Sequence, residues 1–390
     1  MGIHRIKSKH LVRLGLEKGS IAGLALEILR KHFKRADPDD ALAQLKAVIA
    51  QPEAFEMDAI FGPLAERLMP EEVPDPPKQY ALHDAPKGYR SFGATGIDEG
   101  TVAQMDIAMR LPVTRAGALM PDAHVGYGLP IGGVLATQGA IIPYAVGMDI
   151  GCRMCLSIVD LPAKQLQRDQ DNLTKILKRN SQFGKGFFED AGEAEVLDHA
   201  LFEEIPLLKK LQGTAARQLG SSGGGNHFVE FGLVDLPVDA PDLGLKAGQY
   251  FGLLTHSGSR ALGATIAQHY TNIARQSCQL PKNASNLAWL DLDTEAGQSY
   301  WLAMNLAGDY ANACHHDIHR RMMKALGAET LSRVENHHNF AWKETLSTGE
   351  EVMVHRKGAT PAAKGELGII PGSMLQPGFV VRGKGLGSAI

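Results

Sequence analysis

The first seventy residues have the spacing of amphipathic helices. Apolar residues recur three or four positions apart in three stretches that begin near residues 20, 39 and 55, and this period predicts helices. The segment that follows, 69–78, has four prolines within eight residues, and proline cannot continue a helix. We therefore predict a helical N-terminal extension with a proline-rich linker over 1–78 and a second domain over 79–390.

The pattern changes after residue 80. Between 117 and 154, glycines alternate with apolar and β-branched residues, which predicts short buried strands separated by tight turns. Further strands are predicted within 223–234, 250–260 and 331–340. Helical spacing returns at 161–180 and over Glu295–Leu326, and a hairpin turn is predicted at 347–349. Short strands between helices favour a mixed α/β (α+β) fold with the small helical unit attached.

Composition narrows the class of protein. The chain has 390 residues, of which 44% are hydrophobic and 21% charged, as in ordinary globular proteins. Its net charge of −3 argues against non-specific coating of a polyanion but leaves room for a local basic cleft. Four cysteines are too few for a disulfide scaffold, and the N-terminus lacks the apolar core of a signal peptide. With no run of 18 apolar residues, we expect a cytoplasmic enzyme without a membrane segment.

The candidate chemistry begins at Asp149 and Cys152. They lie three apart, separated by a glycine, after a predicted strand, so both side chains could turn toward one point. A thiolate there could bridge two metal ions while the carboxylate holds one of them. The alternative is a buried cysteine after a turn-forming aspartate. Cys155 completes a Cys-x-x-Cys pattern, but no second such pattern exists, and we interpret Cys155 as a core residue.

Two further strand ends carry imidazoles beside polar residues. His227 stands where a glycine-rich loop becomes a strand, between Asn226 and Glu230, which offer an amide and a carboxylate. His256 begins the sequence His-Ser-Gly-Ser-Arg. Its imidazole is a potential metal ligand, and the guanidinium of Arg260 could hold a phosphate through two hydrogen bonds.

Other patterns carry weaker signals. Alternate residues of a strand face opposite ways, so only one of His337 and His338 can point into the same site. His315 and His319 share one face of the long predicted helix, but they lack the intervening glutamate of the zinc-protease motif, so we interpret them as a solvated or packed face. The Gly-x-Ser-x-Gly pattern at 220–224 precedes a strand instead of a helix, which argues against a serine hydrolase.

Seven short segments between residues 117 and 390 carry a resemblance to a known family. In chain order they are MPDAHVGYGLPIGGV, AVGMDIGC, GGGNHFVE, HSGSR, HHN, HRKGAT and IIPGSM. Together they resemble the RtcB family of RNA-splicing ligases. The resemblance implies the mixed α/β fold of that family, with a metal pair in a deep cleft. It also implies a GTP- and manganese-dependent ligase that joins RNA ends bearing a 2′,3′-cyclic phosphate or 3′-phosphate to 5′-hydroxyl ends, through a guanylylated intermediate.

The resemblance implies a role for individual residues. Two Mn²⁺ ions would be held, with the cysteine bridging, by Asp149, Cys152, His227, His256 and His338. The nucleotide and phosphates would be contacted by Asn226, Glu230, Arg260, Lys357 and Ser373. The ligand types alone favour zinc, so manganese and GTP follow from the resemblance only. The implied partners are RNA ends, as in tRNA halves or damaged RNA, and an archease-type activator.

The chain departs from the family near its C-terminus. In the family, a His-Gly-Ala-Gly-Arg segment supplies the histidine that carries GMP, whereas this chain reads Gly387-Ser-Ala-Ile390 where that segment should begin. We therefore expect the guanylylated histidine beyond Ile390 and no covalent GMP adduct on residues 1–390. Two alternatives use the same scaffold. One is a metal-dependent phosphoesterase that opens the cyclic phosphate with activated water, and the other is a module that binds RNA ends without ligase activity.

Overall fold

The chain divides into two compact units, Met1–Pro76 and Pro77–Ile390, close to the expected boundary after residue 78. The structure, a computed structural model, describes residues 6–7, 10–11, 14–16, 20–33, 37–55, 58, 60–68, 76–189, 194–373 and 376–385. Most of the predicted linker, 69–75, lies outside the described residues.

The first unit is helical, in agreement with its apolar spacing. Its elements are α2 (Ser20–His32), α3 (Pro38–Ala50), the 3₁₀ helix η2 (Pro52–Phe55) and α4 (Gly62–Leu68). The side chain of Asp37 caps α3 by accepting a hydrogen bond from the backbone N–H of Asp39, and Pro38 occupies the first turn. The apolar faces form one core that includes Leu29, Leu45, Val48 and Leu64. The third expected helix is interrupted, with η2 and α4 in its place.

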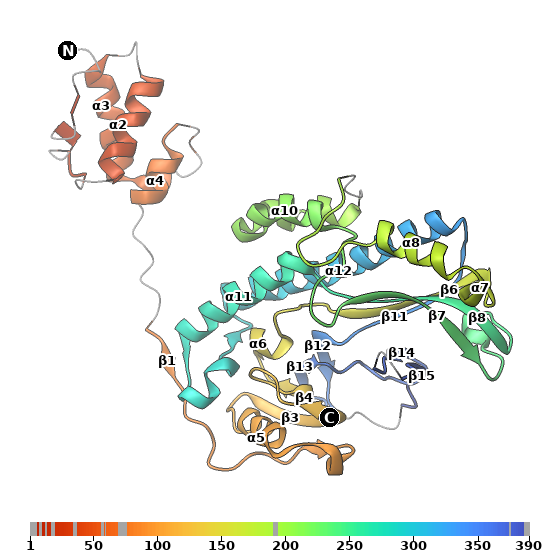
Figure 1. Cartoon of the computed structure of the whole chain (residues 1–390). Helices are drawn as coiled ribbons and strands as arrows, with labels where there is room; N and C mark the ends of the chain where they lie inside the picture. The colour runs from red at the N-terminus through yellow and green to blue at the C-terminus, as the bar shows by residue number, and fades with distance from the viewer. Residues whose placement is uncertain are drawn as a thin grey trace. The chain divides into compact units, whose positions relative to one another are not determined.

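The second unit is built on two sheets, which agrees with a mixed α/β fold (Figure 1). The four-stranded sheet is antiparallel, in the order β11 (Thr330–His337), β6 (Arg153–Pro162), β8 (Gly248–Ser257) and β7 (Phe228–Leu236). The five-stranded sheet has the order β12 (Asn339–Thr345), β13 (Glu351–Lys357), β4 (Ile131–Thr137), β3 (Thr114–His124) and β2 (Arg90–Ser91). Only the β2–β3 pair of these two sheets is parallel.

Three short strand pairs complete the β-structure of the described residues. They are β1 (Lys78–Gln79) with β9 (Cys278–Gln279), β5 (Ala140–Ile141) with β10 (Leu290–Asp291), and β14 (Leu367–Ile370) with β15 (Phe379–Arg382). The helices are α5 (Glu99–Ala108), α6 (Pro143–Val146), α7 (Gln165–Arg168), α8 (Gln170–Asn180), α9 (Leu201–Glu204), α10 (Pro206–Gln218), α11 (Arg260–Ser277) and α12 (Glu295–Leu326). Short 3₁₀ helices lie at η3 (Ala94–Gly96), η4 (Glu195–Asp198), η5 (Pro241–Leu243) and η6 (Lys282–Leu287). None of the described helices is both long and apolar enough to cross a bilayer.

The long helix α12 begins and ends at the predicted residues because both ends are capped. The Thr294 side chain accepts a hydrogen bond from the N–H of Gly297, and Gly327 adopts the left-handed conformation, φ +64°, after the last turn. The helix runs beside α11 in Figure 1 and packs on one face of the four-stranded sheet. The opposite face of that sheet is covered in part by β14, through Ile369.

The segment 331–340 differs from the prediction. It is not one strand, because the chain leaves β11 at His337 and enters β12 of the other sheet at Asn339. His338 is the single residue between the two strands, so it connects the two sheets. The predicted hairpin after it is confirmed, with a turn closed by a 2.9 Å hydrogen bond from the N–H of Leu346 to the carbonyl of Glu350.

Candidate metal centre

The five predicted metal ligands meet near the crossing between the sheets. Asp149 and Cys152 lie in the turn between α6 and β6, His227 directly precedes β7, His256 lies near the end of β8, and His338 separates β11 from β12. They form two groups, Cys152–His256–His338 and Asp149–Cys152–His227. Within each group the potential ligand atoms lie within 4.8 Å of one another. Cys152 belongs to both groups.

The potential ligand atoms face one another at short range. Cys152 Sγ lies 3.1 Å from His256 Nε2 and 3.5 Å from His227 Nε2. His256 Nε2 is 3.0 Å from His338 Nε2, and His227 Nε2 is 2.8 Å from Asp149 Oδ2. One thiol, one carboxylate and three imidazoles suit a divalent transition-metal cation, so the residues present fit a metal centre.

Backbone hydrogen bonds join the two chain segments that carry these ligands. The N–H of His338 donates to the carbonyl of Cys152 over 3.0 Å, and the N–H of Gly151 donates to the carbonyl of Asn339 over 2.8 Å. The side-chain oxygen of Asn339 accepts from the N–H of Gly358 at 2.9 Å, and its Nδ2 lies 3.4 Å from the carbonyl of Asp149. Sequence reasoning gave Asn339 no role, although its place directly after the paired histidines was the available signal.

A backbone carbonyl sets the tautomer of His256. Its Nδ1–H donates to the carbonyl of Asn226 over 2.9 Å, which leaves the lone pair of Nε2 directed at Cys152 and His338. In metal-binding histidines, a hydrogen bond from the ring nitrogen that does not bind the metal orients the ring. Asn226 therefore supports a potential ligand through its backbone, a contribution that its amide side chain did not suggest.

Two glycines are required because side chains of the centre press against them. A Cβ on Gly258 would lie 2.0 Å from Asp149 Oδ1, and a Cβ on Gly223 would lie 2.1 Å from His227 Nδ1. Neither distance is compatible with a methyl group. The glycines beside these motifs thus allow the backbone to approach the ligands closely.

Burial controls the protonation of the centre. It raises the pKa of the Cys152 thiol well above its usual value, with the neighbouring Asp149 charge adding to the effect. Burial also lowers the pKa of His256, and it lowers the pKa of His338 to about 3. For Asp149, burial raises the pKa, but the hydrogen bond and charge of His227 outweigh it and leave the pKa below its usual value. The imidazoles of His256 and His338 are therefore neutral, the form that binds a metal.

Two of the predicted phosphate-binding residues flank the centre. The Gly223 Cβ position that touches His227 would also lie 2.5 Å from Arg260 Nη1. Arg260 is the one non-glycine of the described residues with a left-handed φ, +57°, a strained conformation that often marks functional positions. Lys357 pairs in register with Asn339, next to His338. Its Nζ donates to the carbonyl of Tyr127 over 2.6 Å, and burial lowers its pKa to about 8.

The other predicted nucleotide contacts are exposed. Asn226 precedes β7 and Glu230 lies within it, and both residues are exposed. Partial burial of the Glu230 carboxyl raises its pKa. Ser373 lies in the exposed loop between β14 and β15. The nucleotide roles of these three residues stay predictions. Residues 386–390 lie outside the described residues. The guanylylated histidine, which we expect beyond Ile390, also stays a prediction.

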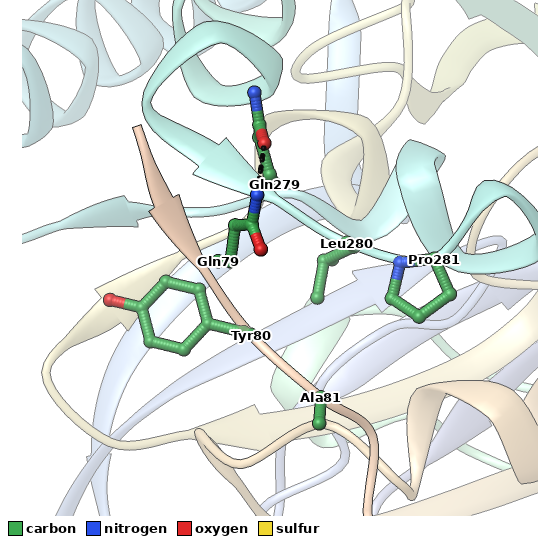
Figure 2. A pocket seen from close by; sticks show the side chains of 6 residues that line it. All are labelled: Gln79, Tyr80, Ala81, Gln279, Leu280 and Pro281. Carbon is green, nitrogen blue, oxygen red and sulfur yellow. Dashed lines mark hydrogen bonds between the residues drawn. The ribbon is translucent and has the colours of Figure 1, made fainter. Parts of the chain in front are cut away.

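A pocket of about 590 Å³ lies in another part of the second unit, and Figure 2 shows the side chains that line it. It is lined by Gln79, Tyr80, Ala81, Gln279, Leu280 and Pro281, where β1 pairs with β9. The side chains of Gln79 and Gln279 hydrogen-bond across it at 3.4 Å. The pocket contains none of the predicted site residues and no charged side chain, so its chemistry does not match the one assembled around Cys152.

A comparison with known protein families matches most of the second unit. The sequence pattern of the family described as "tRNA-splicing ligase RtcB" matches residues 104–206 and 203–389. RNA-splicing ligase RtcB1 of Escherichia coli (strain ATCC 25922) is 33% identical over 301 residues, which covers 69% of this chain and 70% of that protein. RNA-splicing ligase RtcB of Escherichia coli K12 is 32% identical with the same coverage. tRNA-splicing ligase RtcB of Thermococcus kodakarensis is 28% identical over 349 residues, covering 71% of each chain.

Proposed function

The chain belongs to the RtcB family, and on that premise we propose that it is an RNA ligase of tRNA splicing or RNA repair. It joins 2′,3′-cyclic phosphate or 3′-phosphate ends to 5′-hydroxyl ends, with GTP as cofactor and a guanylylated intermediate. Its metal centre, at the bottom of a deep cleft, holds two Mn²⁺ ions. It acts in the cytoplasm on tRNA halves or damaged RNA, with an archease-type activator as partner.

The observation that carries this proposal is the sharing of Cys152 by two ligand groups. A single thiolate between two groups of donors is suited to bridge two cations. One group adds His256 and His338, and the other adds Asp149 and His227. The bridging role, the two ions and their identity as manganese are parts of the proposal that this arrangement supports.

The residues around the centre suit a substrate rich in phosphate. When bound, two divalent cations neutralise phosphate charge and orient the attacking and leaving oxygens of a displacement. Arg260 lies beside His227, and the side chain of Lys357 passes Gly147, two residues before Asp149. A guanidinium can hold two phosphate oxygens at once, and an ammonium acts as a point charge. Since the pKa of Lys357 is about 8, most of its population carries the charge at pH 7.

The proposal is tested with the complete gene product, manganese, GTP and two RNA fragments with matching ends. Joined RNA that requires all components, and that is lost in Cys152→Ala but kept in Cys155→Ala, supports the ligase. Disappearance of the cyclic phosphate without joined RNA would show a phosphoesterase instead. Binding of RNA ends without either reaction would show a binding module.

The guanylylated intermediate needs its own measurement. Residues 1–390 are incubated with manganese and GTP labelled at the α-phosphate, denatured, and examined for label on the protein. We expect no label. Label that survives denaturation and maps to a histidine between 1 and 390 would contradict this expectation and assign the nucleophile to a residue of this chain.

A further inference from the structure

A second group of one cysteine and two histidines lies on the α12 side of the four-stranded sheet. It consists of Cys155, His315 and His319, which are completely buried and whose potential ligand atoms lie within 4.8 Å of one another. By residue type this group resembles the first. Its hydrogen bonds differ, because each of the four ring nitrogens already has a protein partner.

The donors and acceptors of this group form one consistent series. The carbonyl of Ser257 can only accept, so His315 Nε2–H donates to it over 3.1 Å. His315 Nδ1 then accepts from the Thr255 hydroxyl over 2.6 Å. With its proton used, the Thr255 oxygen accepts from His319 Nε2–H over 2.9 Å. His319 Nδ1 finally accepts from the Ser157 hydroxyl over 2.8 Å. We call this series the Thr255 chain.

The outer end of the Thr255 chain is also satisfied. The Ser157 oxygen accepts a 3.2 Å hydrogen bond from Nε of Arg333 on β11. A complete series, in which no buried donor or acceptor is left over, rigidifies the groups that it joins. The Thr255 chain therefore connects α12 by hydrogen bonds to three neighbouring strands, β8, β6 and β11.

The position of the Thr255 chain relates it to the metal centre. Thr255 and Ser257 are the two neighbours of His256 on β8. Because alternate residues of a strand face opposite ways, these neighbours point toward α12 while His256 points toward Cys152. The α12 histidines thus hold both neighbours of a potential ligand from the reverse face of the sheet, Thr255 through its side-chain hydroxyl and Ser257 through its backbone carbonyl. The Asn226 carbonyl fixes its ring from the near face.

We infer that the Thr255 chain, through His315 and His319, positions His256 in the metal centre and does not hold a second metal. The inference rests on the proposed metal binding at Cys152. A metal in the second group would need ring lone pairs that the hydroxyls now occupy, together with a thiolate. Burial raises the pKa of Cys155 to about 12 and lowers the pKa of His315 to about 3, which agrees with a neutral thiol and neutral rings.

The test compares two substitutions of one residue in the full chain. Thr255→Val keeps the shape of the side chain but removes the hydroxyl, whereas Thr255→Ser keeps the hydroxyl. Binding of Co²⁺ and Mn²⁺ is measured by calorimetry, and the absorption of the cobalt–thiolate bond reports the geometry at Cys152. We expect Thr255→Val to weaken binding about tenfold, as supporting hydrogen bonds of metal ligands do, and to alter the cobalt spectrum. Thr255→Ser should restore both.

Each remaining outcome has a defined meaning. If the unaltered protein binds neither ion, the proposed metal centre is wrong and the inference loses its basis. If it binds them and Thr255→Val binds with the same affinity and spectrum, the positioning role is wrong. A metal ion retained by the unaltered protein and lost specifically in Cys155→Ala would overturn the inference in favour of a second metal site. Should Thr255→Val fail to fold, Ser157→Ala tests the outer end of the Thr255 chain. We expect a smaller loss of metal affinity in that variant, and an unchanged affinity would contradict the positioning role.

Discussion

Two groups of one cysteine and two histidines lie on opposite sides of the same sheet: Cys152 with His256 and His338, and Cys155 with His315 and His319. In the first group, ring nitrogens and the sulfur face one another directly. In the second group, every ring nitrogen is bonded to a hydroxyl or a carbonyl. The comparison teaches that residue types and proximity do not identify a metal ligand. The partners of the ring nitrogens decide which group can bind a cation.

The most severe way to break this comparison is to remove each cysteine in turn. Cys152→Ala takes away the donor that both ligand groups share, so we expect manganese affinity to fall by at least about 100-fold, beyond the loss typical of supporting residues. Cys155→Ala removes only buried packing and should lower the free energy of unfolding by about 1 kcal/mol. Calorimetric titration and urea unfolding measure the two effects. Equal losses of metal affinity in both variants would erase the distinction between the groups.

A methyl group added beside the first group should lower metal affinity almost as strongly as the loss of Cys152. In Gly258→Ala the new methyl would meet Asp149 Oδ1 at 2.0 Å, so the carboxylate must shift from its position beside His227. We expect manganese affinity to fall about 10- to 100-fold. Gly232→Ala is the matched control, because no atom lies within 4 Å of a Cβ at that strand position. Unchanged metal binding in Gly258→Ala would remove Asp149 from the centre.

Two cationic side chains beside the first group are proposed to bind phosphate. No such role is proposed for residues beside the second group, so the two cations extend the comparison. Arg260→Ala and Lys357→Ala should each weaken binding of GTP or of an RNA 3′-phosphate by about 1.5–3 kcal/mol, as expected for hydrogen bonds to charged groups. Arg356→Ala serves as the control, because Arg356 pairs with Glu344 at 3.1 Å and stacks over Trp342. Ligand affinity is measured by fluorescence titration. Full affinity in the double variant of Arg260 and Lys357 would exclude both from the phosphate site.

The smallest expected effect concerns the charge on the α12 side of the sheet. Burial alone would raise the pKa of Glu335, but the hydrogen bond of His316 and the charge of Arg153 outweigh it and lower the pKa to about 2. A carboxylate with a lowered pKa stabilises the fold above its unfolded pKa, and that stability is lost as the pH falls. The free energy of unfolding should therefore fall between pH 4.5 and pH 2, and less so in Glu335→Gln. If the unaltered protein and Glu335→Gln lose the same free energy of unfolding over this pH range, as measured by urea unfolding, Glu335 does not have the lowered pKa.

Local sequence signals predicted much of the fold. The 3.6-residue spacing predicted the bounds of α12, and the structure shows the threonine cap and the left-handed glycine that end it there. The glycines beside Asp149, His227 and His256 pointed to loops at strand ends, where the structure brings these side chains together. The crossing between sheets at His338 was not predictable in this way, because residues 335–339 are all polar and contain no glycine or proline that would mark the end of a strand.

The sequence by itself determined the helical and strand segments, the polar residues placed at strand ends and the membership of a family, because these depend on neighbours along the chain. The sequence also separated Cys152, as a potential ligand, from Cys155, as a core residue, and Cys155 is indeed buried. Tertiary structure alone decided that Cys155 lies beside His315 and His319 of α12, since that depends on strand register and on a helix far away in sequence. It also gave Thr255, His315 and Asn339 their hydrogen-bond partners. A side chain carries its donors and acceptors in the sequence, but the groups that satisfy them are fixed only when the sheets and helices pack.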